Sequence, residues 1–212
     1  MRLGRFASLG AFLAAALLAG CASFTLDEEP LPYVPRNFAG EPRLPDTIRR
    51  VVLLPVAGAA TGARPEELDA ALLAALQQAQ RFEVVPLARD ACRRRYGAEA
   101  FNSTAALPPD FLATLGREHA ADAVLFVDVT TRRFYPPLTL GLRARLATVA
   151  DVRLVWTYDE VIAADDPAVV VAVRRRHYQP GNPVDLGPAT LQSPARFGAF
   201  AAEMMFSTLP SR

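Results

Sequence analysis

The chain of 212 residues contains no lysine and only two cysteines and two histidines. Without lysine it has neither a Schiff-base nucleophile nor the lysine of a Walker phosphate loop. His119 and His177 lack the short ligand spacings of zinc sites, so we predict no metal site, and no cofactor is indicated. The formal net charge of +1 indicates no nucleic-acid partner, and no small-molecule substrate is evident.

Long hydrophobic runs are also missing after residue 21, so no later segment reaches the length of a transmembrane helix. One apolar run, residues 10–20, follows the basic residues Arg2 and Arg5 at the amino terminus. It is too short for a permanent membrane-spanning helix, but it is typical of the apolar region of a signal peptide. It ends in the tetrapeptide Leu18-Ala19-Gly20-Cys21.

This tetrapeptide resembles the lipobox of bacterial lipoproteins. The resemblance implies cleavage between Gly20 and Cys21 and acylation of Cys21, with palmitate-like chains that hold the protein to a membrane. Ala22 follows, where lipoproteins retained in the inner membrane typically carry aspartate. We therefore expect a lipid-anchored protein on the periplasmic face of the outer membrane. The alternative is an ordinary secretory signal that happens to contain a cysteine.

The second cysteine, Cys92, has no partner for an intramolecular disulfide once Cys21 is acylated. We predict that it is a small buried hydrophobic residue on a helix. An intermolecular disulfide is the alternative.

The pattern divides the chain into a signal peptide (residues 1–20), a lipidated tether (21–48) and one periplasmic domain (49–212). Residues 22–48 contain five prolines and an acidic run, and they could extend at most roughly 80 Å at 3.1 Å per residue. The alternative is that part of this segment packs against the domain through Tyr33 and Phe38.

The first half of the domain reads as strands alternating with helices. The continuous apolar run 51–56 predicts a strand that is covered on both faces. Leucines four residues apart in 66–80 predict a helix, which leads to a second strand over 82–85. This unit predicts a parallel pair of strands. Helices at 87–97 and 108–119 and a central strand from residue 123 follow.

The second half reads as antiparallel strands followed by helices. Apolar residues alternate with polar ones over 138–147 and again over 152–158, so each strand has one buried face. Asp166 and Ser193 precede prolines and predict N-caps for helices over 168–178 and from residue 194. Residues 179–192 are predicted to be a loop.

These elements predict an α/β fold: a single three-layer domain with a mixed sheet of about five strands and helices on both faces. The order is strand, helix, strand, helix, helix, three strands, helix, helix. With this order, the segments 51–55, 81–85 and 121–156 resemble a family of periplasmic lipoprotein domains that includes the TolB amino-terminal domain, LpoB and CsgG. The resemblance covers roughly residues 49–160 and its motifs are structural. It implies an envelope location and a non-enzymatic role.

The residues themselves indicate no catalytic site, and we predict that the protein is not an enzyme. The connection between Gly58 and Gly62 lacks the Lys-Ser/Thr that completes a phosphate loop. No serine lies in a nucleophile elbow. The acidic residues at 159, 160, 165 and 166 are better explained by a strand end and a helix cap than by a glycosidase pair.

Two exposed groups are candidates for partner contact, although solvated surface is the simpler reading of each. One is the turn at Arg132, Arg133, Phe134 and Tyr135, and the other is the cluster Arg174, Arg175, Arg176 and Tyr178. A third basic run, residues 93–95, has the same two readings. Such groups suit an acidic protein, anionic headgroups or the cell wall.

Together these features predict an outer-membrane lipoprotein that acts as a non-enzymatic adaptor or accessory factor in envelope assembly or transport, with an envelope protein as partner. The alternative is a subunit of an oligomeric secretion or channel assembly that resembles CsgG.

Overall fold

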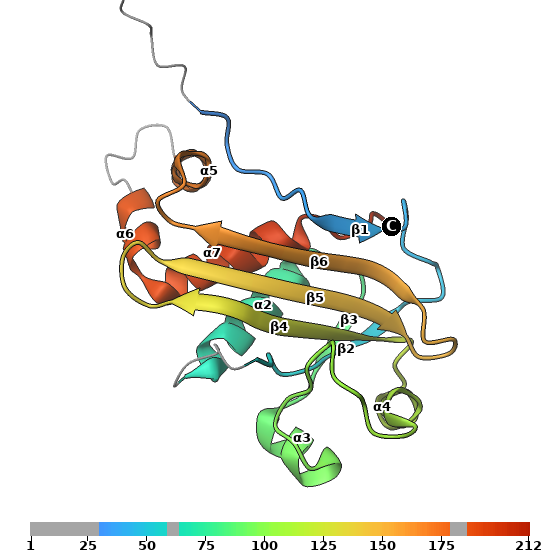
Figure 1. The fold of residues 1–212 in the computed structure, drawn as a ribbon. Helices are drawn as coiled ribbons and strands as arrows, with labels where there is room; N and C mark the ends of the chain where they lie inside the picture. The colour runs from blue at the N-terminus through green and yellow to red at the C-terminus, as the bar shows by residue number, and fades with distance from the viewer. Residues whose placement is uncertain (1–29, 59–63, 179–185) are drawn as a thin grey trace, which may run out of the picture. The chain divides into compact units, whose positions relative to one another are not determined.

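A six-stranded mixed sheet forms the middle of the fold in the computed structural model, which describes residues 30–58, 64–178 and 186–212 (Figure 1). The strand order is β1-β6-β5-β4-β2-β3. The strands are β1 (Phe38–Gly40), β2 (Arg50–Leu53), β3 (Glu83–Pro86), β4 (Ala123–Arg133), β5 (Thr139–Thr148) and β6 (Leu154–Ala163). The helices are α2 (Pro65–Gln78), α3 (Arg89–Tyr96), α4 (Phe111–His119), α5 (Pro167–His177), α6 (Gly187–Gln192) and α7 (Pro194–Phe206).

The parallel part of the sheet comprises β2, β3 and β4. Val51 of β2 is in register with Val84 of β3 on one side and with Ala123 of β4 on the other. The predicted parallel pair is therefore confirmed, and α2 is the connection between its strands. Pro65 occupies the first turn of α2, where the missing N–H of proline leaves no helical hydrogen bond unmade.

The antiparallel part comprises β4, β5, β6 and β1. Leu142 and Leu146 point into the core, whereas Arg143 and Arg145 lie half-buried on the opposite face of β5. The predicted alternation is thus confirmed. After β6, the side chain of Asp166 accepts a hydrogen bond from the N–H of Ala168 at 2.8 Å, as predicted for an N-cap.

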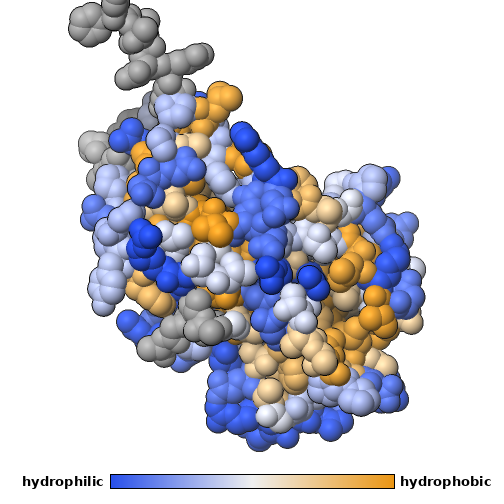
Figure 2. Space-filling view, viewed as in Figure 1, coloured by the Kyte–Doolittle hydropathy of each residue, from blue (hydrophilic) through white to orange (hydrophobic). Residues whose placement is uncertain are grey.

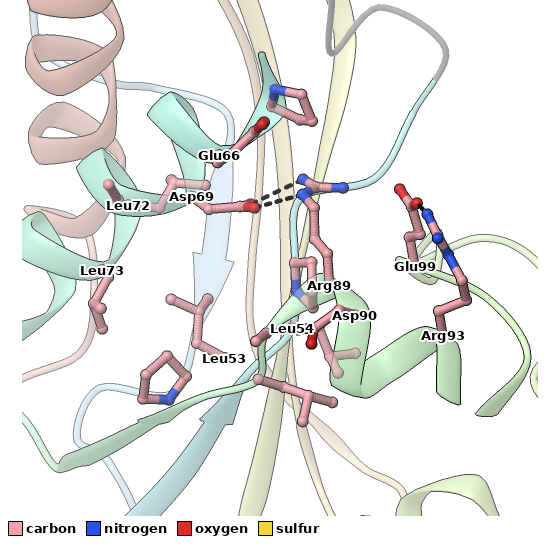
Figure 3. A pocket seen from close by; sticks show the side chains of 16 residues that line it. Leu53, Leu54, Glu66, Asp69, Leu72, Leu73, Arg89, Asp90, Arg93 and Glu99 are labelled. Atoms are coloured by element: carbon pink, nitrogen blue, oxygen red, sulfur yellow. Dashed lines mark hydrogen bonds and ion pairs between the residues drawn. The ribbon is translucent and has the colours of Figure 1, made fainter. Parts of the chain in front are cut away.

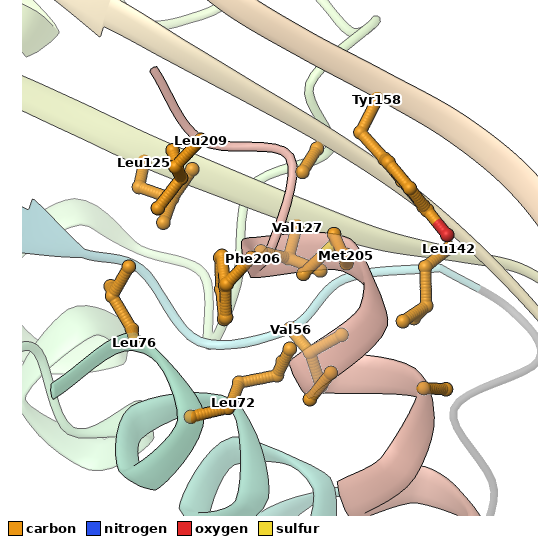
Figure 4. Packing of buried hydrophobic residues seen from close by; sticks show 14 of the residues in the cluster. Val56, Leu72, Leu76, Leu125, Val127, Leu142, Tyr158, Met205, Phe206 and Leu209 are labelled. Atoms are coloured by element: carbon orange, nitrogen blue, oxygen red, sulfur yellow. The ribbon is translucent and has the colours of Figure 1, made fainter. Parts of the chain in front are cut away.

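Two hydrophobic cores lie on opposite faces of the sheet. The larger contains residues of β2, β4, β5 and β6 packed against α2, α5 and α7 (Figure 4). The smaller contains Val52 and Leu54 from the β2 segment, Val124 and Phe126 from β4, and the apolar face of α4. Because successive side chains of a strand point to opposite faces, β2 and β4 contribute to both cores.

Helices cover the two faces unequally. On the smaller-core side, α3 and α4 lie over the β2–β4 region and leave β5 and β6 open toward the viewer (Figure 1). Hydrophilic residues gather across the centre of this view (Figure 2). The predicted α/β class with helices on both faces is confirmed, and the strand count is six instead of about five.

The extra strand belongs to a segment that was predicted as tether. Pro32–Arg212 forms one compact unit, so the predicted boundary at residue 49 lies inside it. The N–H of Tyr33 donates to the carbonyl of Ala168 at 2.8 Å, and β1 pairs with β6. We call residues 33–40 the strap. Tyr33 packs against the larger core, as the alternative predicted, whereas Phe38 is exposed.

A second correction concerns the predicted loop at 179–192. Helix α6 occupies residues 187–192 of it, and residues 179–185 lie outside the described part of the chain. Thr190 of α6 is buried, and its hydroxyl lies 2.9 Å from Nε2 of His177. This contact ties the short helix to α5.

Candidate functional site

The predicted lipidation site, Gly20 and Cys21, lies outside the described residues. Within residues 30–58, 64–178 and 186–212, no helix combines the length and the hydropathy needed to span a membrane.

The turn between β4 and β5 exposes two aromatic residues. Tyr135 is 80 % exposed and Phe134 is 41 % exposed. The guanidinium of Arg132 lies 4.5 Å from the ring centroid of Phe134, and burial lowers the pKa of Arg132. This cation–π contact stiffens the base of the turn and leaves Tyr135 outermost.

The basic cluster at the end of α5 is exposed but not uniform. Arg176 pairs with Glu203 of α7, whose pKa is raised by burial. Arg174 and Arg175 have no ion-pair partner among the described residues, and Tyr178 is exposed. Cations at a helix C-terminus interact favourably with the helix dipole, which is the simplest reason for their position.

The similar arginine run on α3 is neutralised. Arg93 pairs with Glu99, and Arg94 pairs with Asp90 at 2.7 Å. Arg95 donates to Glu118 of α4 at 2.7 Å, with the Tyr96 hydroxyl on the other carboxylate oxygen. These contacts lower the pKa of Glu118. Of the two arginine runs, only the one on α5 presents cations without an ion-pair partner in the part of the chain that the structure describes.

The histidines and Cys92 occupy structural positions. His119 is the last residue of α4, as predicted, and His177 is half-buried against Thr190. Cys92 is fully buried on α3, as predicted, and burial raises the pKa of its thiol. No cluster of three potential metal ligands occurs among the described residues.

The acidic residues of β6 and the following turn have separate partners. Asp159 binds Arg143 at 2.7 Å, and Asp166 caps α5. Glu160 accepts from the hydroxyl of Tyr33 and from the backbone N–H groups of Arg36 and Asn37. This carboxylate therefore holds the strap against β6, a role that its place in an acidic run did not indicate.

Three serines also make local contacts. Ser193 caps α7, and the hydroxyl of Ser207 donates to the carbonyl of Met204 at 2.7 Å. Ser103 donates from its N–H and its hydroxyl to Asp128, a carboxylate on β4 that is almost fully buried. This pair closes the loop after α3 onto the sheet.

One cavity was not predicted from the sequence. It encloses about 680 Å³ where the parallel strands β2 and β3 end and the helices α2 and α3 begin (Figure 3). The chain leaves β2 toward one face of the sheet and leaves β3 toward the other. Adjacent parallel strands with this divergence form a topological switch point, which is where open α/β sheets commonly bind ligands.

A half-buried ion pair forms the wall between the two helices. Arg89 of α3 binds Asp69 of α2 through Nε at 2.6 Å and through one terminal nitrogen at 3.0 Å. The same two side chains bind the backbone of Val56, at 2.8 Å to its carbonyl and 2.7 Å from its N–H. The network connects α2, α3 and the segment after β2, and it therefore fixes the position of both helix N-termini.

Comparisons with known proteins assign no family. No family model matches the chain, and the search of curated proteins found no match. Among solved structures, the chain is similar to the PelC dodecamer of Paraburkholderia phytofirmans at 13 % identity and a TM-score of 0.42, over 59 % of this chain and 79 % of that one. It is similar to lipoprotein GNA1162 of Neisseria meningitidis at 18 % identity and a TM-score of 0.41, over 54 % and 79 %.

A third similar structure is protein XCC0632 of Xanthomonas campestris, of the family model DUF330, at 15 % identity and a TM-score of 0.32. That alignment covers 82 % of this chain and 93 % of the other. These likenesses are distant, and we draw no functional argument from them. The resemblance to the TolB, LpoB and CsgG family stays a prediction.

Proposed function

We propose that the chain is a lipoprotein of the outer membrane, anchored through Cys21, whose domain is a non-enzymatic adaptor in envelope assembly or transport. The observation that supports this most directly is the tetrapeptide ending at Cys21, placed after a basic start and a short apolar run. The mechanism is tethering, because a short link to the membrane raises the effective concentration of the domain for partners there.

The anchor is tested on the full chain in a Gram-negative host. The wild-type protein is expected to incorporate an alkyne-labelled fatty acid and to leave the membrane only in detergent. Cys21→Ser is expected to lose the label and remain unprocessed. Release of the wild-type protein by salt alone, or a mature amino terminus at another residue, would contradict the proposal. Ala22→Asp is expected to move the protein to the inner-membrane fraction.

The partner surface is assigned to the turn that carries Phe134 and Tyr135. Its support is the exposure of Tyr135, which is 80 %. An exposed aromatic side chain has a large apolar area that an interface can remove from water. A photo-crosslinking residue at position 135 is expected to capture an envelope protein in intact cells. The same residue at Val152, an exposed apolar position in another turn, is the matched control.

Loss of that crosslink in Arg132→Ala would show that the stiffened turn matters, whereas equal capture at positions 135 and 152 would overturn the assignment. Size measurement in mild detergent separates the adaptor from the alternative. A closed ring of many copies would favour the secretion or channel subunit.

A further inference from the structure

We propose that the cavity between α2 and α3 binds an amphipathic anion with an aliphatic chain, of which a fatty acid is the simplest example. This ligand class goes beyond the adaptor role, and it is tested independently of the anchor. The volume of the cavity lies within the 300–1,000 Å³ typical of ligand pockets.

The walls favour an aliphatic chain. Their apolar part consists of leucine, proline and alanine side chains from four elements and the segments beside them: Leu53, Leu54, Pro55, Pro65, Ala70, Leu72, Leu73, Pro86, Leu87 and Ala88. No aromatic residue is among the described residues that line it. A nucleobase or another flat ring would find no stacking partner there, whereas a flexible hydrocarbon can follow an aliphatic surface.

The rim supplies a place for an anionic head. Asp69 occupies Nε and one terminal nitrogen of Arg89, and the second terminal nitrogen has no partner among the described residues. In Figure 3 the guanidinium of Arg89 lies above the side chains of Leu53 and Leu54, between α2 and Glu99. Neither α2 nor α3 begins with a side-chain cap, and the first turns of both helices line the cavity, where each already carries an acidic residue, Glu66 in α2 and Asp90 in α3.

Most carboxylates at the rim are already neutralised. Asp69 is paired with Arg89, Asp90 with Arg94, and Glu99 with Arg93. Glu66, at the start of α2, is exposed and has no ion-pair partner among the residues that the structure describes. It is the one carboxylate of the lining without an ion-pair partner among the described residues, and this makes it a direct probe of the sign of the ligand.

The first experiment titrates saturated fatty acids of eight to fourteen carbons, each below its micelle concentration, into the chain carrying Cys21→Ser. This chain has no acyl group of its own. Each added methylene that enters the cavity is expected to tighten binding about fourfold. An affinity that does not depend on chain length would overturn the proposal, and this readout requires no change within the cavity.

The second experiment fills the cavity. Ala70 of α2 lines it from an exposed helix position, so Ala70→Trp is expected to weaken dodecanoate binding at least tenfold with an unchanged melting temperature. Ala74 lies one turn further on the same helix, exposed and outside the cavity lining, so Ala74→Trp is the matched control. Equal effects of the two substitutions would place the fatty acid elsewhere.

The third experiment tests the charge of the head. Glu66→Gln is expected to tighten dodecanoate binding several-fold and to weaken any binding of dodecylamine. Tighter binding of the amine than of the acid to the wild-type protein, with loss of that preference in Glu66→Gln, would overturn the anionic assignment. Failure of all three experiments would leave the adaptor proposal unaffected, because that rests on Cys21 and the turn at Tyr135.

Discussion

The candidate side chains in this fold more often have a structural role, such as burial or the neutralisation of a charge, than a chemical one. Cys92 is buried on α3, and burial raises the pKa of its thiol, so the reactive thiolate is disfavoured. An intermolecular disulfide would require the residue to leave the core. The structure therefore favours the reading of Cys92 as a small hydrophobic residue over the bridging alternative.

Cys92 is expected to resist thiol reagents in the native protein and to react only when the domain opens. The measurement is labelling with iodoacetamide at increasing urea concentration, followed by mass spectrometry. Labelling that follows the loss of circular dichroism is the expected result. Rapid labelling in the absence of urea would contradict the burial.

The two arginine runs show that a sequence pattern predicts a basic group but not whether its charges are paired. The sequence presents residues 93–95 and 174–176 as equivalent basic groups. In the structure three carboxylates neutralise the first, whereas Arg174 and Arg175 of the second stay unpaired among the described residues. The difference depends on carboxylates elsewhere in the chain, such as Glu118. Sequence spacing alone does not show which run they contact.

At the scale of elements, the carboxylate of Glu118 links α3 to α4, in addition to the edge contact between the rings of Tyr96 and Phe111 at 5.1 Å. Glu118 accepts from Arg95 and Tyr96, and these contacts lower its pKa, so the contribution to stability is complete above the unfolded pKa of about 4.3. It is lost as the pH falls through the lower folded pKa. The stability of the wild-type protein is therefore expected to fall below about pH 5 partly through this group.

The check is the urea midpoint between pH 3 and pH 7 for the wild type and Glu118→Gln. The variant is expected to be less stable at pH 7 and to lose less stability on acidification. Asp165→Asn, which changes an exposed carboxylate, is the control. Parallel pH profiles for the wild type and Glu118→Gln would refute the assignment.

In the strap, Glu160 adds three hydrogen bonds to the backbone pairing of β1 with β6 and to the bond between Tyr33 and Ala168. Glu160→Ala removes the acceptor for three donors, and the amide hydrogens of residues 33–40 are expected to exchange much faster as a result. Those of β4, in the centre of the sheet, are expected to keep their protection. Hydrogen exchange with mass spectrometry measures both, and equal rates in the strap before and after the change would show that β1 alone holds it.

Element prediction succeeded where the pattern was long. The alternation in β5 and the caps at Asp166 and Ser193 identified their elements directly, because burial period and caps are local properties. β1 has three residues and α6 has six, so each is too short for the burial period of a strand or a helix to be recognised in the sequence. The cavity was not predicted for another reason, since its walls come from segments that only the folded sheet brings together.

The whole molecule is organised around strands shared between two cores. Leu115 of α4 is fully buried in the smaller core, and Leu72 of α2 is buried in the larger one. Because β2 and β4 contribute side chains to both, we expect the cores to unfold together. Leu115→Ala and Leu72→Ala are each expected to lower the free energy of unfolding by about 2–5 kcal/mol.

Chemical unfolding followed by fluorescence of Trp156, which lies in the larger core, measures this coupling. Leu115→Ala is expected to shift the fluorescence and circular-dichroism transitions equally. Two separate transitions in that variant would show that the smaller core opens alone.

The contact between Glu160 and the strap also affects the largest distance between Cys21 and the domain. If Cys21 sits in a bilayer, the ten residues 22–31 can separate it from the strap by at most about 36 Å. Detachment of the strap through Gly40 would raise this limit to nineteen residues, or about 68 Å. The contacts of Glu160, together with the pairing of β1 with β6, therefore limit how far an anchored domain could lie from its membrane.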